Sequence, residues 1–324
     1  MRKLTILVLA VAAIYAGYWY VGATATENGA TLALEDMRSN GWTVGVEELS
    51  TKGFPSRFDT TAKNLLVVSP DRSIGWSAPF VQALALSYKP NEVIIVFPDA
   101  HAFQLNGQDI NLKTDGLRAS AAVTAAPSAP LANLTVELTS AQARITNHLA
   151  VTIGKSLLAL RPAGGDADYD AYLDLRDVEL PQSLFPEQAG VSGRISQATI
   201  DATVMLDRPL DRHVSVSPRP QIGAIDLNGL TLQWGAMSIR GKGAVNVDPS
   251  GIPTGRITLN LRGWDQMIDL ASVSGLIDPG LVPTAKSMAR TMALGSDTLD
   301  VPLTFENGLM WAGPLPLGPA PRLR

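Results

Sequence analysis

The chain has 324 residues, 46% of them hydrophobic, and a formal net charge of −4 from 26 basic and 30 acidic side chains. This length and hydrophobic content suit a folded body with a sizeable core and exclude a disordered protein. The chain has no cysteine, which excludes disulfide frameworks and Cys-based metal sites, and it has no concentrated basic face of the kind that nucleic-acid partners require.

The N-terminus carries an apolar run long enough to cross a membrane. Arg2 and Lys3 precede a stretch from Leu4 to Ala23 that contains no charged residue. Its length of about 20 residues matches a membrane-spanning helix. Aromatic residues gather at its far end, where their amphipathic rings favour the lipid–water boundary: Tyr15, Tyr18, Trp19 and Tyr20. We therefore expect residues 1–26 to be a retained, single-pass anchor in the inner membrane, with its N-terminus in the cytoplasm and residues 27–324 in the periplasm.

A cleaved signal peptide is the alternative for the same run. Ala23-Thr24-Ala25 has the small-x-small pattern of a cleavage site. Both interpretations place the main domain outside the cytoplasm. Directly after the run, we expect a short helix with Thr26 as its N-cap and Gly41 as its stop.

The stretch KGFPSRFD, from Lys52 to Asp59, predicts a corner between two strands. Gly53 permits a positive φ, and Pro55 forces the preceding residue into an extended conformation. We expect Phe54 to be buried there and Arg57 to be free to touch a lipid headgroup or a partner. Phe54, Arg57 and Trp76, which lies in the stretch GWSAP, are the candidate ligand-binding residues.

Beyond Trp42 the dominant hydrophobic period is two, which is typical of half-buried antiparallel strands. Asn-Gly pairs with apolar flanks predict tight hairpins: Asn106-Gly107, Asn228-Gly229 and Asn307-Gly308. The unbroken VIIVF run at 93–97 is consistent with a strand buried on both faces. The fold class is therefore mainly β with a few helices (α+β), as an elongated, curved antiparallel sheet of hairpins and meanders. The turn-rich stretches 124–130 and 161–168 are interruptions of one β-rich body.

Near the C-terminus the period changes to that of helices. One apolar stripe begins at Trp264 and a second ends at Met292, with Pro279-Gly280 between them. We expect two packed helices, with the methionines as core filler, and then a last hairpin. The final GPLPLGPAPRLR predicts an extended, Pro-rich tail that does not pair centrally in a sheet.

Catalytic and metal-site signals are weak. His101, His148 and His213 are far apart in sequence and have no neighbours at a metal-ligand spacing. Asp166, Asp168 and Asp170 open an acidic stretch that resembles a calcium loop, but Ala171 stands where such a loop needs Gly. Alternation along a strand with one wet face explains the same spacing. We therefore expect no metal, with calcium as the weaker alternative, no other cofactor and no enzymatic activity.

Three stretches together resemble one family: GFPSRFD, GWSAP and LTFENGLMWAGPLPLGPAP. With the apolar N-terminus, they are similar to the uncharacterised envelope family called domain of unknown function 2125, over about residues 42–321. More distantly, the rhythm of short strands and Gly-marked turns is similar to AsmA-type envelope proteins. That likeness implies a membrane-tethered scaffold that could bind or pass lipid.

Three functions follow from these patterns. The first is a non-enzymatic envelope protein, tethered by its N-terminal helix, that binds or handles lipid or lipoprotein. The second is a structural or interaction module of an envelope assembly, which would dock another envelope protein on a sheet edge or on the tail. The third is an envelope hydrolase, which would need histidines and carboxylates to meet in one cleft.

Overall fold

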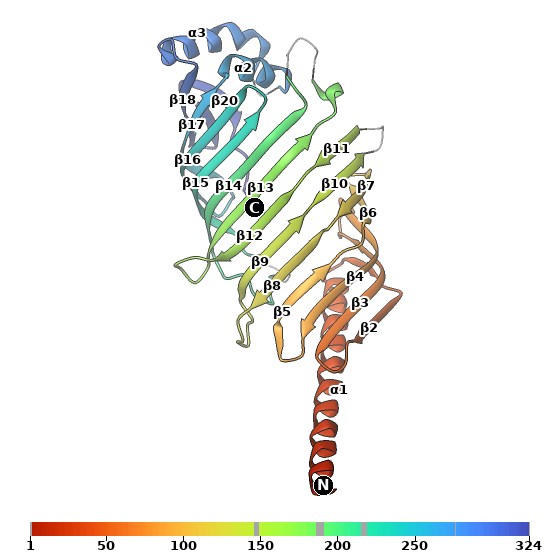
Figure 1. Cartoon of the computed structure of the whole chain (residues 1–324). Coiled ribbons are helices and arrows are strands. Elements are labelled where there is room, and N and C mark those ends of the chain that lie inside the picture. The colour runs from red at the N-terminus through yellow and green to blue at the C-terminus, as the bar shows by residue number, and fades with distance from the viewer. Residues whose placement is uncertain (1, 146–148, 186–190, 215–218, 276, 324) are drawn as a thin grey trace. The chain divides into compact units, whose positions relative to one another are not determined.

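The computed structural model describes residues 2–145, 149–185, 191–214, 219–275 and 277–323. The chain divides into two compact units, Met1–Leu149 and Ala150–Arg324. Strands dominate both units, and helices lie at the N-terminus and near the C-terminus (Figure 1). The predicted class, mainly antiparallel β with an N-terminal helix and a C-terminal helix pair, is confirmed. The single domain predicted for residues 27–324 stays a prediction.

Unit 1 combines one long helix with short antiparallel strands. Its elements are α1 (Arg2–Ser39), β1 (Thr43–Gly45), β2 (Glu48–Lys52), β3 (Arg57–Val68), β4 (Ile74–Leu86), β5 (Lys89–Val96), β6 (Ala100–Leu105), β7 (Gln108–Asp115), β8 (Arg118–Val123), β9 (Leu131–Leu138) and β10 (Ser140–Ile145). Both β1 and β2 pair with β3, which pairs with β4 on its other side. Strand β11 (Leu149–Ile153) lies at the division between the units.

Helix α1 runs without a break through the predicted anchor and the predicted short helix. The expected N-cap at Thr26 is wrong, because its hydroxyl donates to the Gly22 carbonyl inside the helix at 2.9 Å. Gly41 does stop the helix, with a φ of +86° and an N–H that donates to the Arg38 carbonyl at 3.0 Å. Among the described residues, α1 is the one helix long and apolar enough to cross a membrane.

The local turn signals of unit 1 are mostly correct. KGFPSRFD joins β2 to β3, with Lys52 opposite Asp59. Asn106 and Gly107 have φ values of +49° and +81° and form the hairpin between β6 and β7. The expectation that VIIVF is buried on both faces is wrong, because Ile94 is 49% exposed on β5.

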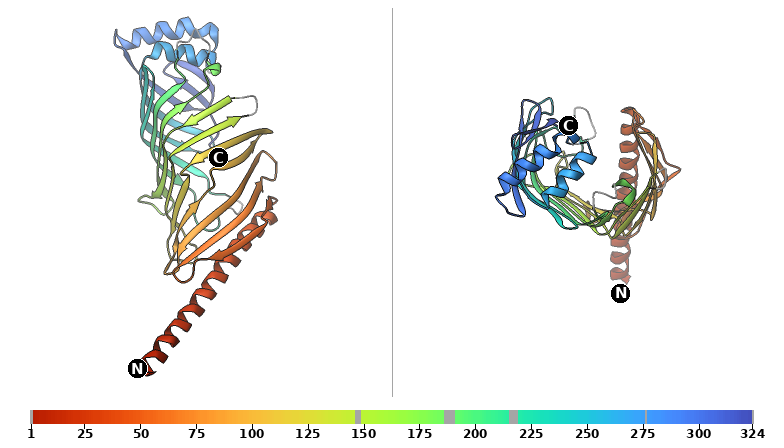
Figure 2. Two further views of the ribbon diagram at one scale, coloured as in Figure 1. Left: turned by 45° about the vertical axis from the view of Figure 1, so that its right-hand side comes forward. Right: turned by 90° about the horizontal axis from the view of Figure 1, so that it is seen from above.

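Unit 2 is an antiparallel meander followed by helices and a small C-terminal sheet. Its elements are β12 (Ser156–Pro162), β13 (Asp168–Glu179), η1 (Gln182–Leu184), β14 (Arg194–Leu206), β15 (Ile222–Trp234), β16 (Met237–Val247), β17 (Pro253–Arg262), α2 (Trp264–Val273), η3 (Pro279–Leu281), α3 (Val282–Ala293), β18 (Thr298–Glu306), β19 (Leu309–Ala312) and β20 (Leu315–Pro319). From β12 to β20 each strand pairs with the next. In Figure 2, α2 and α3 lie across one end of the unit 2 strands.

One predicted hairpin of unit 2 is in the wrong place. Asn228-Gly229 does not turn the chain; it lies inside β15, where the pairing with β16 shifts register between Leu227 and Leu230. The turn comes at Gly235 instead, where the φ is +59° and Trp234 pairs with Met237. The Asn228 amide donates to the Asp201 carboxylate on β14, so here the pair marks a bulge. Asn307-Gly308 does form the predicted hairpin between β18 and β19.

Candidate functional site

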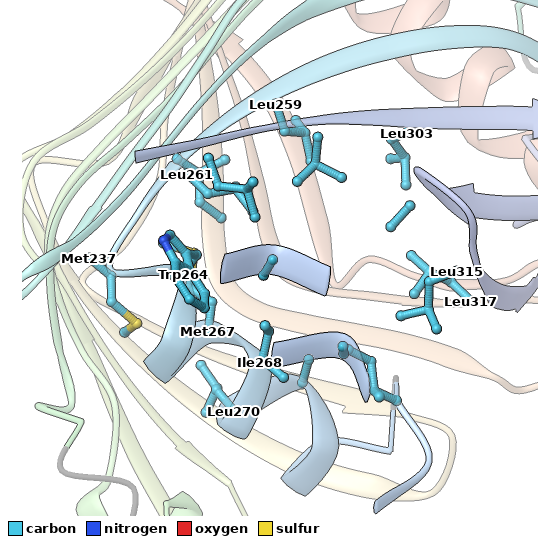
Figure 3. Close-up of a pocket in the computed structure, with 18 of the residues that line it drawn as sticks. Met237, Leu259, Leu261, Trp264, Met267, Ile268, Leu270, Leu303, Leu315 and Leu317 are labelled. Carbon is cyan, nitrogen blue, oxygen red and sulfur yellow. The ribbon is translucent and has the colours of Figure 1, made fainter. Parts of the chain in front are cut away.

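An apolar cavity of about 640 Å³ lies within unit 2 between the helix pair and the strands (Figure 3). This volume falls within the range of roughly 300–1,000 Å³ that is usual for small-molecule sites. The cavity is lined by residues of β15 to β20, α2 and α3, with Phe185, Ser274, Ile277 and Pro314 from the connecting segments. We therefore take this cavity as the candidate ligand site.

The helical walls come from the two stripes that the sequence predicts. Helix α2 contributes Trp264, Met267, Ile268 and Ala271, which recur at helical spacing on one face. Helix α3 contributes Ala285, Met288, Ala289 and Met292 in the same way. Gly263 ends β17 with a φ of +71° and turns the chain directly into α2.

The strand wall is aliphatic. In Figure 3, Leu259 and Leu261 of β17, Leu303 of β18, and Leu315 and Leu317 of β20 surround the same space as the α2 side chains. These five leucines are half-buried although they lie inside the wall of a cavity. Covering their exposed carbon surface with an apolar group would be favourable, because it removes that surface from water.

The lining determines what the cavity can do. The residues with hydroxyl groups are Ser238 and Ser274, and none of the lining residues is charged. Such a cavity can bind an apolar group through burial, with Met side chains adapting to its shape. Its lining includes no carboxylate, histidine or lysine side chain that could act as a general acid or base.

Polar contacts outside the cavity hold the helix pair together. The Lys286 ammonium on α3 donates to the carboxylates of Asp269 at 2.8 Å and Asp265 at 3.1 Å, both on α2. The hydrogen bond with Asp269, assisted by Asp265, raises the pKa of Lys286 above its ordinary value. A small core of Ala289, Ala293 and Leu299 fixes α3 on β18.

The predicted site residues Phe54 and Arg57 lie elsewhere, against α1 in unit 1. The Phe54 ring meets Trp19 edge to face at a centroid distance of 5.5 Å, and the Trp19 indole donates to the Arg57 carbonyl at 2.8 Å. The Arg57 guanidinium pairs with Asp59 at 2.9 Å. The expected burial of Phe54 is wrong, because the side chain is 58% exposed at the hairpin tip; its neighbour Phe58 is the buried aromatic residue.

Trp76 lies in an aromatic cluster of unit 1 and does not meet Phe54. Its ring stacks against His101 and Phe103 with centroid distances of 6.1 and 6.2 Å. Its indole N–H donates to Nδ1 of His101 at 3.3 Å, and burial lowers the pKa of that histidine. The buried His101 completes a packed aromatic cluster. Ligand binding by Phe54, Arg57 and Trp76 stays a prediction.

The remaining chemical candidates form no common site among the described residues. His213 contacts Asp211 at 3.3 Å on an exposed segment, and His148 lies outside the described residues. Asp168 and Asp170 lie on β13, as the strand interpretation expects, and Asp170 pairs with Arg161 at 3.2 Å. Asp166 precedes the strand, and no group of three or more His, Asp or Glu side chains in the described parts of the chain could share a metal ion.

The apolar stripes of the two C-terminal helices are the sequence signal for the cavity, but they do not show that a space remains between the helices and the strands. The two helical stripes predict packed core, with methionine as filler. The helices do pack, but a cavity of about 640 Å³ remains between them and the strands, which periodicity alone does not reveal.

Comparison with known proteins gives one match. A family model described as "Uncharacterized protein conserved in bacteria (DUF2125)" matches residues 19–321. No curated protein and no solved structure matches the chain. The matched range begins at Trp19 on α1 and includes every residue that lines the cavity.

Proposed function

We propose that this chain, which belongs to the DUF2125 family of uncharacterised bacterial proteins, is a membrane-tethered envelope protein that binds an acyl chain of a lipid or lipoprotein in the unit 2 cavity. The observation that carries this proposal is the lining: about 640 Å³ surrounded by aliphatic, aromatic and Met side chains with no charged group. An acyl chain is the common envelope ligand that needs no polar partner along its length.

Burial of an acyl chain in this cavity would contribute enough free energy for binding in the micromolar range. Each methylene group removed from water contributes about 0.8 kcal/mol, so about ten methylenes would contribute about 8 kcal/mol. Before ordering costs, that corresponds to a dissociation constant of about 1 μM. A charged headgroup would stay outside, because the lining offers it no counter-charge.

Helix α1 supports a retained tether. It does not end near the cleavage pattern at Ala23-Thr24-Ala25 but continues to Ser39. Residues on both sides of that pattern contact the strands: Gly22 lies against the Phe58 ring, and the Glu27 carboxylate accepts from the Thr51 N–H at 2.9 Å. We propose that Arg2 and Lys3 mark the cytoplasmic side, so that residues 27–324 lie in the periplasm.

The test fills the cavity without removing packed side chains. Ala271→Phe on α2 and Ala312→Phe on β19 place a ring in the cavity, while Ala224→Phe on β15 is a matched control at a half-buried alanine outside the lining. Full-length protein is extracted in detergent, its bound lipid is identified by mass spectrometry, and binding of radiolabelled palmitate is measured. We expect the two cavity variants to lose bound lipid and to bind palmitate at least about tenfold more weakly, a change of about 1.4 kcal/mol.

The control variant Ala224→Phe should retain both its bound lipid and its affinity for palmitate. Equal palmitate binding by all variants, or lipid-free wild-type protein, would contradict the acyl-chain proposal. If the extracted protein carries no lipid but retains a stoichiometric protein partner, the interaction-module alternative would replace the acyl-chain proposal.

A further inference from the structure

Helix α1 begins to contact unit 1 close to its N-terminus. The Tyr15 hydroxyl donates to the Pro55 carbonyl at 3.0 Å, and the Tyr18 hydroxyl donates to the Ser87 carbonyl at 2.7 Å. The two loops are also joined to each other, because the Ser87 N–H donates to the Ser56 carbonyl at 2.9 Å. We call the loops at 53–56 and 87–88 the hairpin-tip pair. They are the turns between β2 and β3 and between β4 and β5.

The length of α1 places these tips at membrane depth. The hydrocarbon core of a bilayer is about 30 Å thick and needs about 20 helical residues to cross it. From Leu4 to Tyr15 the helix rises only about 17 Å at 1.5 Å per residue. A tilt would shorten that rise along the bilayer normal. If Arg2 and Lys3 remain at one surface, the opposite surface is reached near Ala23, beyond the point where Tyr15 meets the tips.

The exposed side chains of the tips fit that location. Phe54 is 58% exposed and Tyr88 is 67% exposed, although both are large and aromatic. Tyr20, on the neighbouring turns of α1, is 70% exposed. Aromatic rings of this kind favour the headgroup region of a bilayer. The ends of the adjoining strands carry Lys52 and Lys89, which are exposed cations that suit lipid phosphates.

We infer that the hairpin-tip pair inserts into the periplasmic leaflet of the membrane that α1 crosses, with Phe54 and Tyr88 as its interfacial contacts. This inference rests on the proposed tether. It adds a second membrane contact that fixes unit 1 against the bilayer surface. The partner is a lipid surface, because the helix that meets the tips is itself the apolar segment proposed to lie in the bilayer.

The absence of cysteine allows a direct test with single labels. Tyr88→Cys and Phe54→Cys are labelled with the environment-sensitive fluorophore NBD in the full chain. Gln108→Cys, at the turn between β6 and β7, is the control. Gln108 pairs with Leu105, which lies opposite Ile74 at the start of β4. The hairpin-tip pair adjoins Leu86 at the end of β4, and Ile74 and Leu86 are about 40 Å apart at 3.3 Å per residue.

The labelled proteins are reconstituted in vesicles of phosphatidylethanolamine and phosphatidylglycerol, with and without nitroxide-labelled lipid. We expect the label at 88, and at 54, to show blue-shifted emission and several-fold stronger quenching by nitroxide than the label at 108. Circular dichroism checks that each variant is folded, and Tyr88→Cys alone decides the result if Phe54→Cys is not.

Alkaline carbonate extraction separates the two proposals. If the protein stays with the vesicles but the label at 88 is quenched no more than the label at 108, the tip contact is wrong and the tether stands. If carbonate releases the protein, the tether is wrong and the tip contact fails with it. Palmitate binding by the unit 2 cavity is measured on the same samples and is independent of both results.

Discussion

Helix α1 of unit 1 and helix α2 of unit 2 pack against their strands in opposite ways. Helix α1 presents Gly22 and Ala23, so the ring of Phe58 lies directly against the helix and is only 3% exposed. Helix α2 presents Trp264 and Met267, and a cavity of about 640 Å³ remains between the helix pair and the strands. Small residues close a helix–sheet contact, whereas bulky ones hold the two surfaces apart unless the strands fit around them.

The polar contacts of the two regions also differ: those of α1 join the helix to the rest of unit 1, whereas those of α2 and α3 join the two helices to each other. Helix α1 is joined to the hairpin-tip pair and to the start of β3, through aromatic hydroxyl and indole groups that donate to backbone carbonyls. Helices α2 and α3 are joined to each other by Lys286, which leaves their apolar faces to the cavity. The first region is therefore a closed helix–strand contact, and the second encloses a cavity.

The largest effect is expected where the closed contact of unit 1 is emptied. Phe58→Ala removes a buried ring and should lower the free energy of unfolding by about 3–5 kcal/mol, because the space left against Gly22 cannot collapse. Phe54→Ala is the control at an exposed ring and should cost about 1 kcal/mol or less. Denaturant unfolding in detergent measures both, and equal losses would show that the contact is not closed.

In unit 2 the comparison is between two leucines of β18 that both line the cavity, one buried and one half-buried. Leu299 is 5% exposed in the cluster that fixes α3, and Leu299→Ala should cost about 2–4 kcal/mol. Leu303→Ala, on the same strand and also in the cavity wall but only half-buried, should cost only about 1 kcal/mol because less of its surface is in contact with other side chains. Both values refer to lipid-free protein. A similar cost for both would mean that the cavity is closed in solution.

Overpacking the closed contact should have a smaller effect. A Cβ at Gly22 would lie 2.5 Å from the Phe58 ring, so Gly22→Leu should cost about 1–3 kcal/mol. Gly17→Leu is matched in chemistry, and its Cβ would meet nothing within 4 Å. Limited proteolysis between α1 and β2 should accelerate in the first variant and remain unchanged in the second. Unchanged cleavage of Gly22→Leu would show that α1 does not dock as described.

The smallest effect concerns a turn near the C-terminal end of α1. Hydrogen bonds from Ser69 and Ser73 lower the pKa of Asp71 to about 2. Because this pKa is depressed in the folded state, the carboxylate stabilises unit 1 above the ordinary Asp pKa of about 4, and the contribution is lost as the pH falls toward 2. Asp71→Asn should therefore be slightly less stable than wild type at pH 7 and equal to it near pH 2. Thermal unfolding at both values checks this, and a difference that persists at pH 2 would contradict it.

Local patterns predicted a large part of the fold. The period of two beyond Trp42 predicted antiparallel strands such as β14, and Asn106-Gly107 predicted a hairpin, because side-chain direction in a strand and positive φ in a turn are decided within a few residues. Asn228-Gly229 carried the same signal but lies in a strand, because pairing along both edges of β15 outweighs a local turn preference. The membership in the family was also recognisable from residues alone.

The candidate site shows the limit of such patterns. The sequence by itself determined that the chain begins with an apolar helix, continues as antiparallel strands and ends with two amphipathic helices, because these depend on composition and periodicity. Only the tertiary structure decided that the faces of Trp264 and Met292 enclose an open cavity while Gly22 lies closed on Phe58. The physical reason is that packing depends on the fit between surfaces that are distant in sequence, and hydrophobic periodicity records which face is buried but not how closely it is filled.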